Sequence, residues 1–187
     1  MKKIDNYKVI STTSGDKGLS KNYSNVQLSK SDILFETLGN IDELSSTLGI
    51  IYHMTEEQDI IRLIQTKLQN ISSLIATSVD SSRRESLIKI TNDDILVIEE
   101  LEQRLLNETV IEPIFVLPGS DTSKLGAQYD LSRSVTRRAE RSLVLFTEAN
   151  RRSDLNYCLK YLNRLSDLLF IYARSEASKK SYKKSRM

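Results

Sequence analysis

Residues 154–177 read DLNYCLKYLNRLSDLLFIYARSEA, and this stretch decides the class of fold. Its apolar residues Leu155, Leu162, Leu165, Leu169 and Tyr172 recur at spacings of three, four and seven. That period places them on one face of an α-helix, and such a face is buried against other apolar surface. No glycine or proline interrupts the stretch, so we expect one long helix here.

The same helical period recurs through most of the chain upstream. It predicts further helices at about residues 41–54, 56–79 and 122–148, and one that starts near Asn92. Thr91 followed by Asp94 resembles a capping box at the start of that helix, with Asp in place of the usual Glu. Five long amphipathic helices with short connections predict an all-α, up-and-down five-helix bundle.

The chain of 187 residues is expected to form a single domain in three parts. Residues 1–40 are rich in Gly, Ser, Thr and Asn and form an irregular N-terminal segment. The bundle spans residues 41–177, and a basic tail spans residues 178–187. The tail holds five basic residues and no acidic ones, so the rest of the chain is mildly acidic despite the formal net charge of +2. We expect a solubilising tail rather than a nucleic-acid contact.

Composition excludes several classes of site. The one cysteine, Cys158, cannot form an intramolecular disulfide and more often fills a core, and the one histidine, His53, cannot build a His-rich metal centre. No apolar run reaches the roughly 18 residues of a membrane span. The first residues contain no apolar signal region, so we expect a cytoplasmic protein.

Four arginines fall within nine residues of the predicted fourth helix. Arg133, Arg137 and Arg141 are spaced by four and therefore form a stripe, with Arg138 and Glu140 beside it. The guanidinium fork suits a phosphate or a carboxylate. The stripe therefore predicts either a polyphosphate site or a network of ion pairs within or between subunits.

Two other segments carry polar residues of interest. Residues 14–18 place two glycines around an acid and a base, so backbone amides there are able to line a phosphate, although an ordinary loop explains them as well. Asn163 is a poor helix former within the predicted last helix, so it either contacts a ligand or satisfies a buried group. Asp42 is interpreted first as a helix-start residue, which the helix dipole favours.

Together these segments resemble the PduO-type ATP:cob(I)alamin adenosyltransferase family. The motifs that carry the resemblance are Thr12-Thr-Ser-Gly-Asp-Lys-Gly18, Lys30-Ser-Asp32, Glu36-Thr-Leu-Gly-Asn-Ile-Asp-Glu-Leu44, Phe115-Val-Leu-Pro-Gly119, the arginine helix from Arg133 to Arg141, and Tyr161-Leu-Asn-Arg-Leu-Ser-Asp167. They occur in the family's order and at nearly its spacing, from residue 12 to about residue 177.

The resemblance implies a reaction and an assembly. Cob(I)alamin would attack C5′ of ATP and give adenosylcobalamin and triphosphate. Mg²⁺ would be required, and the resemblance implies no metal ligand from the protein. The assembly would be a homotrimer with sites at subunit interfaces. A flavoprotein reductase and an adenosylcobalamin-dependent enzyme would be its protein partners. Because cobalt(I) is itself a strong nucleophile, the protein would position substrates, exclude water and stabilise the leaving group.

The resemblance also implies roles for individual residues. The residues that would bind ATP are Thr12, Thr13, Ser14, Gly15, Ser20, Lys21, Lys30, Arg137, Arg138, Glu140, Arg141 and Asn163. Arg137 would carry most of the charge toward the phosphates. Asp42 and Arg133 would pair between subunits beside the corrin. Phe115 would cover the lower face of cobalt as a buried aromatic and displace its axial ligand.

Some positions depart from the family pattern. Thr13 stands where the family usually has Arg or Lys, which removes one cationic contact. Asp130 stands where the family commonly has His, and Ser120 replaces a Gly after Leu-Pro-Gly. The last two changes fall on the cobalamin side of the site.

Two other functions compete with the transferase. One is a catalytically weak relative that binds ATP or adenosylcobalamin as a delivery or sensing module. The other is a helical nucleic-acid binder that uses the arginine stripe and the basic tail, whose binding would fall steeply with salt. The acidic body counts against nucleic acid, and a purely structural bundle leaves the joint spacing of the motifs unexplained.

Overall fold

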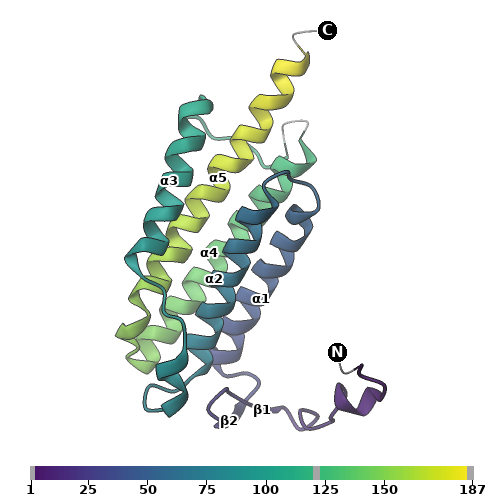
Figure 1. The fold of residues 1–187 in the computed structure, drawn as a ribbon, viewed down its shortest axis with the longest axis vertical. Coiled ribbons are helices and arrows are strands. Elements are labelled where there is room, and N and C mark those ends of the chain that lie inside the picture. The colour runs from purple at the N-terminus through teal and green to yellow at the C-terminus, as the bar shows by residue number, and fades with distance from the viewer. Residues whose placement is uncertain (1–2, 120–122, 185–187) are drawn as a thin grey trace.

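Five α-helices make up most of the computed structural model, which describes residues 3–119 and 123–184 and side chains up to residue 178 (Figure 1). The helices are α1 Ile33–Tyr52, α2 Gln58–Ala76, α3 Asn92–Glu108, α4 Lys124–Asn150 and α5 Asn156–Lys184. They lie side by side along the long axis, so the predicted all-α five-helix bundle is confirmed. Ser120 and the side chains of the basic tail beyond Ser178 lie outside the described residues.

The packing order places α4 and α5 at the centre. Helix α4 packs against α5 and α1, α3 packs against α5, and α2 packs against α1. All five residues of the predicted face are buried: Leu162, Leu165, Leu169 and Tyr172 on α5, and Leu155 in the 3₁₀ turn just before it. Each such side chain contributes about 1.5–3 kcal/mol when fully buried. No helix in the described ranges combines the length and the apolar character needed to cross a membrane.

Helix α1 begins eight residues earlier than the sequence predicted. Asp32 is its N-cap, and the Asp32 side chain accepts a hydrogen bond from the Leu34 amide at 2.9 Å. Asp42 therefore lies in the middle of α1 rather than at its start, and its interpretation as a helix-start residue is wrong. Inside the bundle, the Thr37 hydroxyl lies 3.1 Å from the Ser142 hydroxyl of α4, which joins the two helices.

Other local predictions are confirmed. The capping box of Thr91 and Asp94 is present at the start of α3. Besides these predictions, the structure places His53 as the C-cap of α1. Cys158 is buried among apolar side chains, and burial raises the pKa of its thiol to about 12. It is therefore a core residue and not a nucleophile.

The sequence missed a small antiparallel hairpin before α1. Strands β1 Leu19–Lys21 and β2 Gln27–Ser29 pair through three residues each. The turn between them rests on Asn22, whose side-chain oxygen accepts hydrogen bonds from two backbone amides within the turn, both at 2.9 Å. The Ser24 hydroxyl accepts from the Ser78 amide at 2.9 Å, so the hairpin is fixed to the end of α2.

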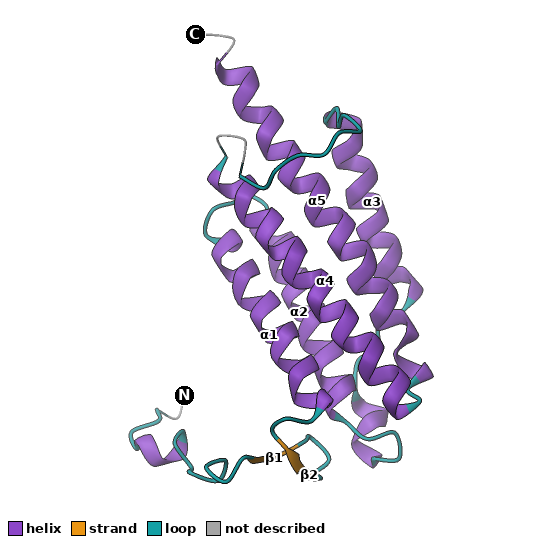
Figure 2. Ribbon diagram, turned by 180° about the vertical axis from the view of Figure 1, so that it is seen from behind, coloured by secondary structure: helices purple, strands orange, loops and turns teal. Residues whose placement is uncertain are grey.

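The residues before the hairpin form an arm that extends away from the bundle (Figures 1 and 2). Its one turn of 3₁₀ helix, Tyr7–Val9, buries no residue. Ile4, Tyr7 and Ile10 are all exposed. The arm therefore presents apolar side chains to its surroundings rather than to its own core.

Candidate functional site

The arginine stripe lies on the outer side of α4. Val135, Ala139 and Leu143 face the core of the bundle, so Arg137 and Arg141 are turned outward and exposed. Neither guanidinium forms a hydrogen bond or an ion pair with any residue of the described ranges. Because they are one turn apart, about 6 Å along the axis, they are spaced to meet neighbouring phosphates of one ligand.

Arg138, which lies beside the stripe, differs from Arg137 and Arg141 because it is bonded within the chain. Its Nε donates to Asn40 Oδ1 at 3.0 Å, and its guanidinium forms an ion pair with Glu43. The Asn40 amide in turn donates to Glu36 at 3.1 Å. Arg138 is thus tied to α1, and the role in nucleotide binding expected of it stays a prediction.

Glu140 and Asn163 meet across α4 and α5. Asn163 Nδ2 donates to Glu140 Oε1 at 3.0 Å, and Asn163 Oδ1 accepts from Arg164 Nη1 at 2.8 Å. Arg164 Nε donates to Glu99 of α3 at 3.0 Å. These residues line a cavity of about 380 Å³, to which Lys160 also contributes. The chain of hydrogen bonds fixes the orientation of the Asn163 amide beside the exposed arginines.

The N-terminal candidates gather around Lys30. The Thr12 and Ser14 hydroxyls lie 2.8 Å apart, and Thr13 takes a left-handed conformation with φ of 56°. A Cβ atom at Gly15 would lie 2.7 Å from the Lys30 Nζ, so the end of the Lys30 side chain passes directly over Gly15 and would have to shift for a larger residue there. Two hydroxyls, a glycine and an ammonium group therefore share one loop, which is chemistry suited to a phosphate.

Ser20 and Lys21 extend the same group along β1. Ser20 pairs with Leu28 and Lys21 with Gln27 across the hairpin. The Lys30 amide donates to the Gly18 carbonyl at 2.8 Å, which closes the loop onto the end of the hairpin. No hydrogen bond or ion pair in the described part of the chain joins this loop to α4. Within one chain, the two halves of the expected nucleotide site are therefore separate.

Asp42 and Arg133 do not pair within the chain. Asp42 is exposed on α1 and lines a cavity of about 460 Å³ between α1 and α2, together with Arg62 and Gln65. Arg133 lies on α4, where its Nε is 3.8 Å from Asp130 Oδ1. The pair expected between subunits stays a prediction.

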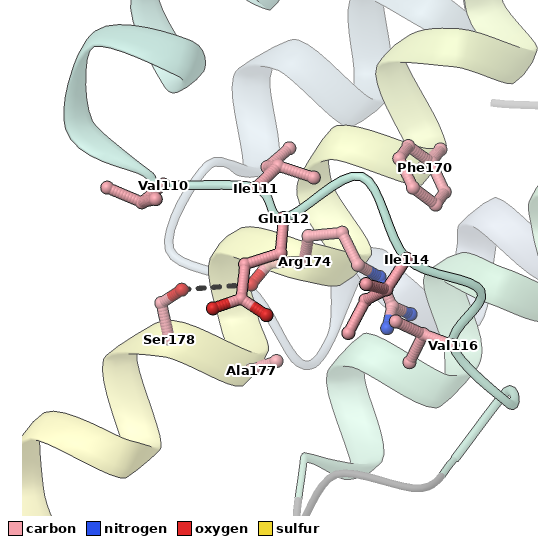
Figure 3. Close-up of a pocket in the computed structure, with 9 residues that line it drawn as sticks. All are labelled: Val110, Ile111, Glu112, Ile114, Val116, Phe170, Arg174, Ala177 and Ser178. Atoms are coloured by element: carbon pink, nitrogen blue, oxygen red, sulfur yellow. Dashed lines mark hydrogen bonds between the residues drawn. The ribbon is translucent and has the colours of Figure 1, made fainter.

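Phe115 lies on the connection between α3 and α4 and is 90% exposed. Ile114 and Leu117 of the same connection are also exposed. The buried position expected for this aromatic is therefore not formed by one chain alone. The connection borders a cavity of about 190 Å³ on α5, lined by Ile114, Val116, Phe170 and Arg174 among others (Figure 3).

Three charged residues in or near the core were not among the site residues predicted from the sequence, although Asp130 was noted there as a departure from the family pattern. Asp130 of α4 and Arg174 of α5 form an ion pair inside the bundle. Glu102 of α3 has one carboxylate oxygen with no hydrogen-bond partner among the described residues. Burial, aided by nearby Asp167 and opposed by Arg164, raises the pKa of Glu102 to about 7. In the sequence, the only indication of such residues is a charged side chain on an otherwise apolar face of a helix.

Comparison with known proteins gives a consistent result. The cobalamin adenosyltransferase family matches residues 10–176. The human corrinoid adenosyltransferase MMAB is 37% identical over 178 residues, which cover 91% of this chain and 69% of the human protein. A corrinoid adenosyltransferase of Citrobacter freundii is 31% identical over 89% of this chain and 94% of its own length.

Solved structures agree with these relatives. A variant of the PduO-type ATP:corrinoid adenosyltransferase from Lactobacillus reuteri, complexed with cobalamin and ATP, superposes with a TM-score of 0.80 at 27% identity. The superposition covers 92% of this chain and 95% of that one. A second variant of that enzyme, complexed with ATP, gives a TM-score of 0.79.

Proposed function

The chain belongs to the cobalamin adenosyltransferase family, and on that premise we propose that it transfers the 5′-deoxyadenosyl group of ATP to cob(I)alamin. The products are adenosylcobalamin and triphosphate. The observation that carries this proposal is the pair of exposed guanidinium groups of Arg137 and Arg141, which have no partner among the described residues, since a leaving triphosphate needs such donors.

The reaction needs no nucleophile from the protein. The electron pair of cobalt(I) attacks C5′ of ATP, a cobalt–carbon bond forms, and the C5′–oxygen bond breaks with its electrons moving to the triphosphate. Cys158 is buried with a raised thiol pKa, and His53 caps α1, so neither has a part in this step. The side chains therefore hold both substrates, exclude water and stabilise the charge of the leaving group.

ATP binding uses two groups of residues from adjacent subunits of a homotrimer. One group is the N-terminal loop and hairpin, with Thr12, Thr13, Ser14, Gly15, Ser20, Lys21 and Lys30. The other is the α4–α5 face, with Arg137, Arg138, Glu140, Arg141 and Asn163. Two observations support this arrangement. The two groups are separate within one chain, and the arm exposes apolar side chains that would be covered if the arm packed on a second copy.

The corrinoid occupies the opposite end of the bundle. Phe115 covers the lower face of cobalt there, supported by its 90% exposure on an apolar connection. With the axial ligand displaced, cobalt(II) is easier to reduce to the nucleophilic cobalt(I). Asp42 of the partner subunit pairs with Arg133 beside the corrin, supported by the absence of a hydrogen bond to the Arg133 guanidinium within the described chain.

Mg²⁺ enters with the nucleotide. The described residues contain no group of three or more acidic, His or Cys side chains able to hold a metal. Mg²⁺ is commonly bound through substrate phosphates with few protein ligands, so this fits a metal carried by ATP. The reductase, the adenosylcobalamin-dependent enzyme and a cytoplasmic location stay predictions from the sequence.

An anaerobic assay tests the proposal. Purified protein is mixed with chemically reduced cob(I)alamin and Mg-ATP, and adenosylcobalamin and triphosphate are measured together. Equal amounts of both products are expected. ATP binding without product formation would favour a delivery or sensing module. If the protein neither bound ATP nor formed product, the proposal would be wrong. A binding assay with single-stranded DNA at low and high salt tests the nucleic-acid alternative.

A further inference from the structure

Asp130 is an acidic side chain in the buried interior, where a charge is costly. It lies on α4 and is only 4% exposed, and its Oδ2 accepts from the Arg174 guanidinium of α5, which is 7% exposed. A buried ion pair of this kind is often no more stabilising than apolar residues of the same size. Its presence in the core therefore asks for an explanation other than stability.

The second oxygen of Asp130 points to that explanation. Asp130 Oδ1 lies 3.8 Å from Arg133 Nε, one turn further along α4. That Nε atom is buried and has no hydrogen-bond partner among the described residues, while the Arg133 side chain is 29% exposed. The carboxylate therefore attracts the inner edge of the guanidinium and leaves its outer edge to groups outside the chain.

The pair also borders the region that the proposed function gives to the corrinoid. Arg174 lines the cavity of about 190 Å³ between α5 and the connection that carries Phe115. Figure 3 shows Arg174 reaching from α5 toward Ile114 and Val116 of that connection. Asp130 thus links a residue at this cavity to the arginine proposed to pair with Asp42 of the partner subunit.

We propose that Asp130 is a positioning residue for the corrinoid half of the reaction, which holds Arg133 in its working orientation while Arg174 holds Asp130. The inference rests on the proposed function. Asp130 does not touch the reacting atoms. It acts by electrostatic attraction on one edge of Arg133, so that less conformational freedom is lost when the other edge binds.

Steady-state kinetics of Asp130→Asn test this role. The change keeps the shape and removes the charge. The KM for cob(I)alamin should rise about tenfold, the low end of the loss seen when a residue that orients a ligand-binding group is removed. The KM for ATP should stay within about twofold, because the arginines that face ATP are further along α4. Equal changes in both KM values, or none, would overturn the proposal.

A double-mutant cycle separates positioning from folding. If Asp130 acts through Arg133, Asp130→Asn should have no further effect on cob(I)alamin kinetics in an Arg133→Ala background. Additive effects would show that Asp130 does not act through Arg133. Should Asp130→Asn fold poorly, Asp130→Asn with Arg174→Met removes both buried charges. That variant should keep the raised KM for cob(I)alamin, and a return to the wild-type value would reduce Asp130 to a partner of Arg174.

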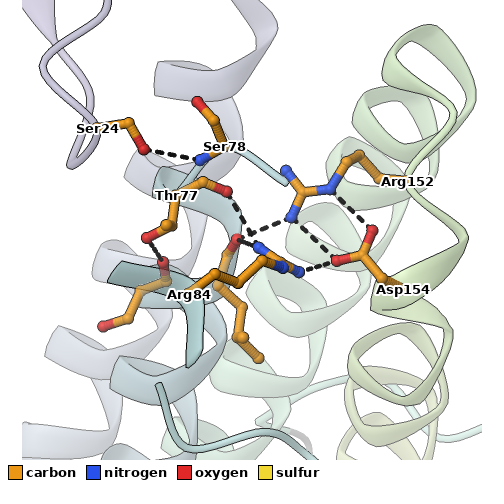
Figure 4. A network of polar contacts seen from close by, with 8 residues as sticks. Ser24, Thr77, Ser78, Arg84, Arg152 and Asp154 are labelled. Atoms are coloured by element: carbon orange, nitrogen blue, oxygen red, sulfur yellow. Dashed lines mark hydrogen bonds and ion pairs between the residues drawn. The ribbon is translucent and has the colours of Figure 1, made fainter. Parts of the chain in front are cut away.

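Asp154→Asn is the matched control. Asp154 also lies between two arginines, Arg84 and Arg152, at the far end of the bundle (Figure 4). Its loss should lower stability without shifting the KM for cob(I)alamin, and an equal shift would refute a specific role for Asp130. Wild-type protein without any turnover would instead contradict the proposed function, so the two failures are distinguishable.

Discussion

The two ends of the bundle each hold a carboxylate beside two arginines, and they differ in how fully the arginines are bonded. At one end, Asp154 binds Arg84 and Arg152, and the Arg152 Nη2 also donates to the Leu74 carbonyl at 2.9 Å. Arg84 donates to the same carbonyl and to that of Thr77, at 3.2 and 3.1 Å. Figure 4 shows this network closing the end of α2 onto the α4–α5 turn.

At the other end, Asp130 binds Arg174. The Arg133 Nε lies 3.8 Å from Asp130 Oδ1 and has no hydrogen-bond partner among the described residues. Buried polar groups are nearly always satisfied in folded proteins. A network that is complete within one chain has a structural role. An arginine such as Arg133, which is incompletely bonded and 29% exposed, is available to a ligand or to a second subunit. Arg137 and Arg141, further along α4, share that availability.

The largest expected effect concerns an unbonded arginine of the stripe. Arg137→Ala should lower kcat/KM for ATP by roughly 10²–10³, the usual loss when a donor to a developing negative charge is removed. Stability should not change, because the side chain is exposed and bonded to no described residue. Steady-state kinetics with varied ATP, together with urea denaturation, measure both quantities.

Arg104→Ala is the control for that change. Arg104 is also a helical, partly exposed arginine, and it lies on α3, away from the stripe. Unlike Arg137, its guanidinium forms an ion pair, with Glu57 at 2.8 Å. Its removal should leave the KM for ATP unchanged. If Arg137→Ala and Arg104→Ala gave the same kinetics, the distinction between bonded and unbonded arginines would carry no functional meaning.

The next effect falls on stability and comes from the bonded end. Asp154→Asn leaves Arg84 and Arg152 facing each other, with the Arg152 side chain only 6% exposed. Because Arg152 is buried while Asp154 is partly in water, the loss should be smaller than for a fully buried ion pair, at about 2 kcal/mol. Urea denaturation should show that loss, while both KM values stay at the wild-type level. A stable variant would mean that the backbone carbonyls alone suffice to hold the two arginines.

A smaller effect is expected at Phe115, which is exposed on the connection between α3 and α4. Phe115→Ala should slow the reaction that begins from cobalt(II) by about tenfold, or ~1.4 kcal/mol in the barrier. The reaction begun from pre-reduced cobalt(I) should be affected much less, because the lower-face role concerns reduction. Leu117→Ala, on the same exposed connection, is the control. Equal losses in both reactions would contradict this role of Phe115.

Much of this contrast was visible in the sequence, because helical faces depend on local spacing. The period of three and four identified the buried face of α5 and the outward arginine stripe of α4. The start of α1 was missed because Gly39 and Asn40 suggested a break. In the folded chain, Asn40 bonds to Arg138 of α4 and Glu36 of α1, and these contacts compensate for its poor propensity.

The unpredicted parts depend on contacts between distant segments. Asp130 and Arg174 are 44 residues apart, and their pairing depends on the register of α4 against α5, which no local pattern specifies. The hairpin has only three residues in each strand, too few for a period of two to be recognised. The nucleotide site is divided between two regions of one chain, so the sequence motifs alone do not show how they meet.

The smallest expected effect tests whether every unbonded charge is functional. Glu102 also has a carboxylate oxygen without a partner, and burial, with Asp167 and Glu99 against Arg164, raises its pKa from 4.5 to about 7. Because the folded state holds this proton more tightly than the unfolded chain, wild-type stability should fall as the pH rises from about 4.5 to 7.

Glu102→Gln has no proton to lose there, so it should be the more stable protein at pH 8, by less than ~1 kcal/mol because the group is still partly in water. Melting temperatures of both proteins at pH 5 and pH 8 measure the difference, and kinetics at pH 8 should be equal. A carboxylate without hydrogen-bond donors can take up a proton and become neutral. An arginine without acceptors keeps its charge, because it does not lose its proton in proteins. Among the incompletely bonded groups, only the arginines therefore keep a charge that a ligand can bind. Altered kinetics in Glu102→Gln would show instead that the acid belongs to the site.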